Sequence, residues 1–280
     1  MYQLRHFIFL FILLPCISVN SVFAKEVLEL WVHPYLSATE ITRKFTPLVD
    51  YLNKQNDFLV ELHISVSYSA HIKRIGEGRI GLAYLGPALY VKLTKQYGKQ
   101  ALLATLEING QPMFHGMIVT RSDSAIHHIK DIAGKSFAFG SPGSTMSHIL
   151  PQYMLSQNGI SLKQLRVFKF LNSHQNVALG VLGGYYDAGA MKEEVFYKYQ
   201  QRGLRMVATS PPVYEHLFIA NKSLPKKTHL LIQQQLISLT DQKVLTSIKK
   251  TVTGLVVSAD KNYDGLRKIF QTNNDFLNQP

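Results

Sequence analysis

The hydrophobic pattern of the chain alternates between the period of a strand and the period of a helix. From Val27 onward, short runs rich in β-branched and aromatic residues are separated by longer stretches with helical spacing. The predicted strands are Val27–His33, Leu59–Val66, Ile80–Leu85, Ala101–Glu107, Phe114–Thr120, Ser136–Phe139, Arg166–Phe170, Tyr186–Ala190 and Arg205–Ala208. The predicted helices between them are Ala38–Asn53, Ala70–Gly76, Ala88–Tyr97, Thr145–Asn158, Gln175–Leu182 and Lys192–Gln201. This α/β alternation predicts parallel-dominated sheets flanked by helices.

The alternation occurs twice, which predicts two lobes. The first unit ends near Gln111 and the second runs from about Ile129 to Thr209, while the last third of the chain is predicted to be helical. Two segments then cross between the units, so we expect a two-segment hinge with one lobe formed by residues 25–116 and 217–280 and the other by 117–216. Ligands of open parallel sheets bind beyond the carboxyl ends of the strands. The turns that follow the strands are therefore the places to look for a site.

The first 24 residues differ in composition from the rest. Arg5 precedes the apolar run Phe7–Leu14, and small residues lead up to Ala24, which predicts a signal peptide cleaved after Ala24. An uncleaved anchor is the alternative, although the run is short for a transmembrane helix and Pro15 interrupts it. Cys16 is the only cysteine, so a mature chain has no thiol for catalysis, a disulfide or a metal site.

The formal net charge of +12 is compatible with an anionic ligand, a nucleic acid or an acidic membrane surface. The Lys and Arg residues are scattered rather than clustered, and an exported protein meets little nucleic acid, so we expect no nucleic-acid partner. A membrane-associated basic protein stays an alternative that depends on the charge alone. His33, His63 and His71 lack the spacing of metal ligands, and we interpret them as surface or packing residues.

The turn after the strand at 136–139 carries the strongest chemical signal. Two glycines and Pro142 are followed by Ser144 and Thr145, where a helix is predicted to begin. Free amides, the positive end of the helix dipole and hydroxyl donors can together bind an oxyanion. A plain helix cap is the alternative interpretation, because Ser and Thr cap many helices.

Two other turns offer polar groups to the same edge. His174 falls in the first turn of a predicted helix, where it can donate a hydrogen bond to an anion. Glu194 follows another strand, and a carboxylate there either faces the cleft or is solvated at the helix start. In the first lobe, Tyr68 and Tyr84 offer aromatic walls with a hydroxyl at the tip, although each can equally be a core residue.

Three ordered segments resemble the phosphate/phosphite/phosphonate-binding family of periplasmic receptors of ABC transporters. They are Gly86–Tyr90, then Gly140–Thr145 with Pro151 downstream, then His174 through Asp187–Ala190. The resemblance covers about residues 28–220 and fades in the C-terminal helices. It implies the type II periplasmic-binding-protein fold, two α/β lobes joined by a two-segment hinge.

The resemblance also implies which residues hold a phosphonate group. The family's hydroxyl triplet matches Ser144 and Thr145, but Met146 stands at its third position and Ser147 replaces the usual glycine. The family histidine matches His174.

Further matches concern the walls and the acidic residues of the family site. A family tyrosine matches Tyr68, whereas a second one falls on Phe114, which lacks the hydroxyl. Members that bind aminoalkylphosphonates use two acidic residues for the ammonium group. Glu194 matches the first, and the second falls on His216 or Glu215.

From the residues and the resemblance together we expect a periplasmic, monomeric protein that captures a small phosphate-, phosphite- or phosphonate-like anion by hinge closure. It would deliver this ligand to an inner-membrane ABC permease, without a cofactor. A receptor of the same fold that signals to a partner protein is the alternative. An enzyme is disfavoured, since the chain has no Gly-x-Ser-x-Gly elbow, no HxxxH metal pair and no cysteine nucleophile after the signal.

Overall fold

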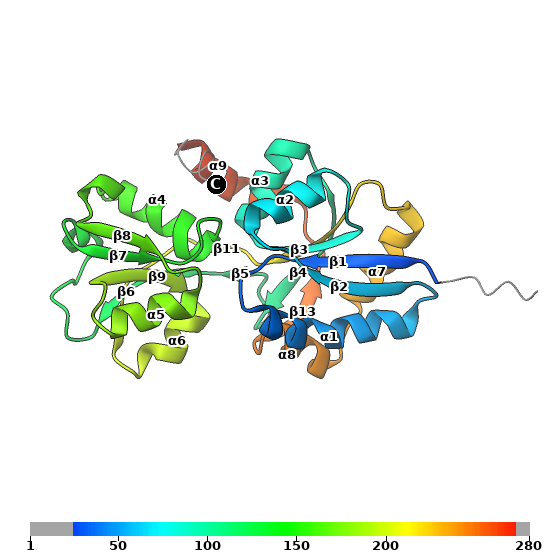
Figure 1. Ribbon diagram of the computed structural model, residues 1–280, viewed down its shortest axis with the longest axis horizontal. Coiled ribbons are helices and arrows are strands. Elements are labelled where there is room, and N and C mark those ends of the chain that lie inside the picture. Colours follow the sequence, from blue (N-terminus) through cyan, green and yellow to red (C-terminus); the bar gives the residue numbers. More distant parts are fainter. Residues whose placement is uncertain (1–24, 273–280) are drawn as a thin grey trace, which may run out of the picture.

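The computed structural model describes residues 25–272, and these residues form two α/β lobes side by side (Figure 1). The predicted signal peptide and Cys16 lie outside the described residues. Within residues 25–272, no helix combines the length and the apolar character needed to cross a membrane.

The first lobe is built on a six-stranded sheet with the order β13-β4-β12-β3-β1-β2. Its strands are β1 (Val27–Val32), β2 (Leu59–Ile64), β3 (Leu82–Leu85), β4 (Ala101–Ile108), β12 (Leu217–Ala220) and β13 (Val252–Val256). Its helices are α1 (Ala38–Gln55), α2 (Tyr68–Gly76), α3 (Pro87–Tyr97), α7 (Lys226–Ile237), α8 (Gln242–Ile248) and α9 (Asp264–Thr272), with a short 3-10 helix, η4 (Asp260–Tyr263), before α9.

The second lobe is built on a five-stranded sheet with the order β10-β6-β9-β7-β8. Its strands are β6 (Gly116–Arg121), β7 (Ser136–Phe139), β8 (Val167–Phe170), β9 (Ala188–Lys192) and β10 (Leu204–Thr209). Its helices are α4 (Leu150–Gln157), α5 (His174–Leu182) and α6 (Glu193–Gln200), with short turns η1 (Ile129–Ile132) and η3 (Leu162–Gln164) and a π-helical turn, η2 (Thr145–Ile149), that leads into α4.

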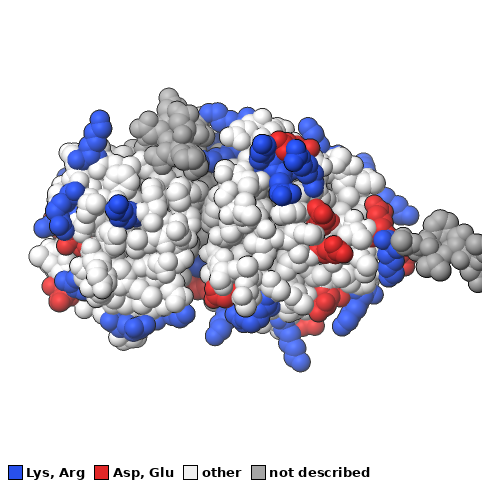
Figure 2. Space-filling view, in the orientation of Figure 1, with Lys and Arg blue, Asp and Glu red and all other residues white. Residues whose placement is uncertain are grey.

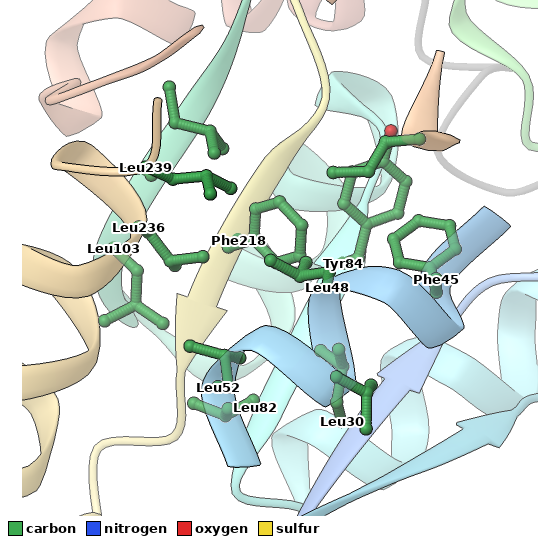
Figure 3. Packing of buried hydrophobic residues seen from close by; sticks show 14 of the residues in the cluster. Leu30, Phe45, Leu48, Leu52, Leu82, Tyr84, Leu103, Phe218, Leu236 and Leu239 are labelled. Atoms are coloured by element: carbon green, nitrogen blue, oxygen red, sulfur yellow. The ribbon is translucent and has the colours of Figure 1, made fainter. Parts of the chain in front are cut away.

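Two short antiparallel strands join the lobes. These are β5 (Met113–Phe114) and β11 (Val213–Tyr214), and they lie between the two sheets in Figure 1. Each lobe has a core of its own, and a further cluster of buried residues joins Met146 and Ile149 of the second lobe to residues of α3 in the first. In the first lobe, Phe45 of α1 and Phe218 of β12 pack on Tyr84 of β3, with ring centroids 4.8 and 4.9 Å away (Figure 3). Tyr84 is therefore a core residue as well as a candidate site residue.

The α/β class is as predicted, and most strands of each sheet run in one direction, but both sheets are mixed. Pairs such as β1 with β2 and β7 with β8 are parallel, but β12 runs antiparallel to both β3 and β4, and β6 runs antiparallel to β9. The physical reason is the pair of crossings. A strand that follows a crossing, such as β6 or β12, enters its sheet from the end opposite to that of the strands in the βα units. It therefore runs in the opposite direction to them.

The last third of the chain also departs from the prediction of helices alone. Residues 252–256 form β13, which pairs antiparallel with β4 and so becomes the edge of the six-stranded sheet. The run is five residues long and contains Gly254, which weakens its strand signal. Its pairing partner lies far away in the sequence, so the local pattern alone does not predict it.

Candidate functional site

A small cavity lies at the boundary between the two lobes. Its walls come from the first lobe, the second lobe and the crossings, and they are formed by His33, Tyr35, Tyr68, Gly86, Leu89, Phe114, Gly143, Ser144, Thr145, Met146, His174, Lys192 and His216. It shares Tyr35, His174, Lys192 and His216 with a wider space, which we call the vestibule and which is lined mainly by residues within 34–44, 172–176, 192–198 and 248–251. On the face shown in Figure 2, Lys and Arg are scattered over both lobes rather than gathered in one patch.

Ser144 and Thr145 meet the cavity at the start of η2. The Ser144 Oγ accepts a hydrogen bond from the Ser147 amide at 3.2 Å, which is a helix cap. The Thr145 Oγ1 accepts one from the Ala88 amide at 3.0 Å. Because each oxygen acts as acceptor in these bonds, each hydroxyl keeps its hydrogen for a further partner. The plain cap and the anion-binding interpretation are thus compatible.

The bond between Thr145 and Ala88 also joins the lobes. Ala88 lies in the first turn of α3, in the first lobe, and Thr145 belongs to the second lobe. Both residues are buried, at 5% exposure for Thr145 and 0% for Ala88. The structure therefore shows the lobes in contact at the cavity.

His174, the first residue of α5, is held in one tautomer. The Lys192 amide donates a hydrogen bond to its Nδ1 at 3.0 Å, so in the neutral ring the proton lies on Nε2. Burial, and then the nearby Lys192, His216 and Lys249, hold its pKa well below the usual value. A neutral His174 can thus donate one hydrogen bond from Nε2.

His33 lines the cavity, although its sequence context predicts a packing or surface residue. Its Nδ1 lies 3.2 Å from the Tyr84 carbonyl oxygen, which can only accept, so Nδ1 carries the proton and Nε2 is an acceptor. Burial and the neighbouring His216 and His71 hold its pKa well below the usual value. Its ring stacks on His216 with centroids 5.5 Å apart. No local sequence signal distinguishes His33 from the other histidines.

The remaining walls are aromatic and apolar. Tyr68 follows the Ser67 cap of α2, and its ring packs edge-on against His33 at 5.1 Å. Burial raises the pKa of Tyr68, so its hydroxyl stays protonated and can donate. Phe114 of β5 and Met146 of η2 are 1% exposed and close the cavity with apolar surface.

Three of the expected site residues, Ser147, Tyr84 and Glu194, do not line the small cavity. Ser147 is buried and does not line the cavity; it lies so close to Gly140 that a Cβ atom on this glycine would stand 2.1 Å from the Ser147 Oγ. This corrects the prediction that Ser147 belongs to the site, because the π-helical turn directs it toward the end of β7. Tyr84 lines the vestibule but not the cavity, since its ring is packed in the first-lobe core.

The acidic residues form a buried network with lysines. Glu194 of α6 lines the vestibule, with its Oε2 2.9 Å from the Lys192 Nζ and 3.8 Å from the Lys249 Nζ. Glu215 is 1% exposed, and its Oε1 lies 2.7 Å from the Lys249 Nζ. The other oxygen of Glu215 lies 2.7 Å from the His216 Nδ1. His216 therefore faces the cavity, and Glu215 stands behind it.

The neighbouring charges of this network shift the pKa values of Glu215, Lys249 and Glu194 so that each group stays charged. Although burial opposes ionisation, Lys249 and then His216 hold the pKa of Glu215 far below its ordinary value. Despite the same opposing effect, Glu215 and then Glu194 raise the pKa of Lys249. Lys192 and Lys249 likewise lower the pKa of Glu194. Lys192 and Lys249 are site residues that the sequence pattern did not indicate.

The sequence of this chain matches those of known substrate-binding proteins. The family model of the periplasmic substrate-binding proteins of phosphonate ABC transporters matches residues 30–263. A probable phosphite-binding protein of an ABC transporter from Prochlorococcus marinus is 25% identical over 205 residues, which are 70% of this chain and 68% of that protein. A phosphate-import protein from Mycolicibacterium smegmatis is 26% identical, over 59% of this chain and 54% of its own length.

Solved structures show the same fold. The Prochlorococcus marinus protein PhnD1 in complex with methylphosphonate superposes with a TM-score of 0.79 at 21% identity, over 89% of this chain and 98% of that one. A binding protein component of a phosphonate transporter from Pseudomonas aeruginosa also gives a TM-score of 0.79, at 16% identity, over 90% of this chain and 88% of that chain.

Proposed function

Because the chain belongs to the periplasmic substrate-binding proteins of phosphonate ABC transporters, we propose that its interlobe cavity captures a small phosphorus oxyanion. Phosphite, phosphate and methylphosphonate are the leading ligands. The observation that carries this proposal is the convergence of hydrogen-bond donors from both lobes on one buried cavity. Thr145 and His174 each keep a hydrogen to donate there, and Tyr68 adds a hydroxyl from the opposite lobe.

The proposed mechanism is capture by closure of the lobes. Hydrogen bonds to a charged oxygen are stronger than neutral ones, and they strengthen further when water is excluded. The donors of η2 and α5 lie in the second lobe, whereas Tyr68 and α3 lie in the first. A ligand bound between them makes its full set of contacts only when the lobes meet. This differential binding favours the closed form.

The proposal extends to the cellular setting of the protein. We infer that the chain is exported, that its leader is cleaved after Ala24, and that the monomer hands its ligand to an inner-membrane permease. The family membership supports this inference, since such receptors work with a permease.

The proposed ligand class is tested by isothermal titration calorimetry on the mature protein, residues 25–280, after a ligand-stripping unfolding and refolding step. Saturable one-to-one binding of phosphite, phosphate or methylphosphonate is the expected result, with sulfate as the comparison anion. Failure of all three phosphorus anions to bind a folded protein would overturn the proposal.

We expect that Thr145→Val will weaken phosphorus-anion binding by about 10- to 100-fold, because a hydrogen bond to a charged group contributes about 1.5–3 kcal/mol. Valine keeps the shape of the side chain but can neither donate to the anion nor accept from the Ala88 amide of the other lobe. Thr46→Val on α1 is the matched control, since Thr46 is exposed and bonds only its own helix. Calorimetry with equal affinity for Thr145→Val and the control would remove Thr145 from the site.

A further inference from the structure

Two carboxylates of the vestibule, Glu194 and Glu215, form ion pairs with lysines of the protein itself. We propose that Lys249, assisted by Lys192, occupies the position that a positively charged ligand group would need. The protein then takes phosphonates without an amino group and discriminates against those with one. This inference rests on the proposed function, and it makes Lys249 a specificity-determining residue.

Each oxygen of Glu215 already has a partner within the protein. Its Oε1 lies 2.7 Å from the Lys249 Nζ. Its Oε2 accepts hydrogen bonds from the His216 ring at 2.7 Å and from the His216 amide at 2.8 Å. At 1% exposure, Glu215 is almost fully buried in the wall of the vestibule.

Glu194 is the second carboxylate near the cavity, and lysines approach it from both lobes. The Lys192 Nζ of the second lobe lies 2.9 Å from its Oε2, and the Lys249 Nζ of the first lobe lies 3.8 Å from the same atom. Lys192 itself lines the small cavity. A ligand cation at the Oε2 of Glu194 would therefore meet ammonium groups that the protein supplies.

The vestibule as a whole carries a surplus of positive charge. Its walls hold six basic side chains against four acidic ones: Arg43, Lys44, Lys192, Lys198, Lys249 and Lys250, against Glu40, Glu193, Glu194 and Glu215. A ligand that places its oxyanion in the cavity extends the rest of its structure into this space. An ammonium group there meets like charge in a partly buried environment, where Coulomb repulsion is less screened than in water.

Comparing two ligands of nearly equal shape separates the effect of the ammonium charge from the effect of ligand size. In propylphosphonate a methyl group stands where 2-aminoethylphosphonate has its ammonium, so the ratio of their dissociation constants reports on that charge. We expect calorimetry at pH 7 to show the amino compound binding at least tenfold more weakly than propylphosphonate. Equal or tighter binding of the amino compound would overturn the inference while leaving the proposed function intact.

The variant Lys249→Met tests the assignment to this residue. It removes the internal ammonium but leaves Glu215 its two hydrogen bonds from His216, and we expect the affinity ratio to shift at least tenfold toward the amino compound. Lys222→Met is the matched control, because Lys222 is exposed and lines neither the cavity nor the vestibule, and the ratio should stay unchanged. An unchanged ratio in Lys249→Met would overturn the role of Lys249.

The remaining outcomes also separate the two proposals. If Lys249→Met does not fold, as judged by circular dichroism, the ligand ratio of the unaltered protein still decides the inference. If methylphosphonate binds and neither longer phosphonate does, cavity size rather than charge sets the specificity, and the inference is wrong. If no phosphorus anion binds at all, the proposed function itself fails.

Discussion

Gly143→Val is expected to weaken phosphorus-anion binding by at least 100-fold while hardly changing the stability of the protein. A Cβ atom at Gly143 would lie 2.4 Å from the Tyr68 Cδ1 and 3.1 Å from the Tyr68 Cβ. Gly143 belongs to the second lobe and Tyr68 to the first, so the added side chain would obstruct the contact between the lobes. A loss of 100-fold corresponds to about 2.7 kcal/mol of binding free energy.

The reason for expecting little loss of stability is that three of the four buried clusters of the described residues lie within one lobe, and Gly143 belongs to none of the four. Gly143 does not have a positive φ, so a side chain there meets no backbone restriction. In an open form the clash with Tyr68 is absent. Urea unfolding without ligand should therefore give an unfolding free energy within about 0.5 kcal/mol of the unaltered protein, as for substitutions outside the special sites.

Gly265→Val in α9 is the matched control for this substitution. A Cβ at Gly265 would have no neighbour within 4 Å, and the residue lies away from the cavity. Anion affinity measured by calorimetry should be unchanged in this control. Tight binding by Gly143→Val would contradict the view that the anion is held by two lobes in contact.

Much of the fold could be predicted because its signals are local. Strands such as β1 and β3, and the helices between them, follow from the spacing of hydrophobic residues and from the Gly and Pro residues that separate the elements. The direction of β12 and the existence of β13 could not be predicted in this way. Both depend on pairing with β4, which is set by tertiary structure rather than by residues nearby.

The same division applies to the candidate site. Ser144, Thr145 and His174 begin helices, so their position beyond a strand end is visible in the sequence. His33 could not be found, because its role depends on a hydrogen bond to Tyr84, 51 residues away. Lys249 lies 34 residues from Glu215, its partner, and no periodicity connects the two.

The pairing of Glu215 with Lys249 leads to the second large expected effect. We expect that Glu215→Gln will lower the free energy of unfolding by about 3–5 kcal/mol, since removing one partner of a buried ion pair leaves the other charge uncompensated. Glutamine keeps the size of the side chain, so the effect reports on charge. Glu193→Gln is the matched control: Glu193 is only half-buried, and we expect a change within about 0.5 kcal/mol.

The stabilising effect of Glu215 is expected to depend on pH in a direction set by its lowered pKa. The folded pKa of Glu215 lies far below its ordinary 4.5, so its contribution to stability is fully present above about pH 4.5 and is lost as the pH falls toward the folded pKa. The difference in unfolding free energy between the unaltered protein and Glu215→Gln, measured by urea titration, should therefore be constant from about pH 7 to about pH 5. It should shrink below about pH 4.5.

A double substitution separates the charge pair from other effects of the change. Glu215→Gln combined with Lys249→Met removes both charges, so the buried ammonium no longer lacks a partner, and we expect the double variant to be more stable than Glu215→Gln alone. The two single losses should then fail to add, as they do for residues in direct contact. Additive losses in urea unfolding, or a loss below about 1 kcal/mol for Glu215→Gln, would mean that this ion pair does not stabilise the region where the chain returns to the first lobe.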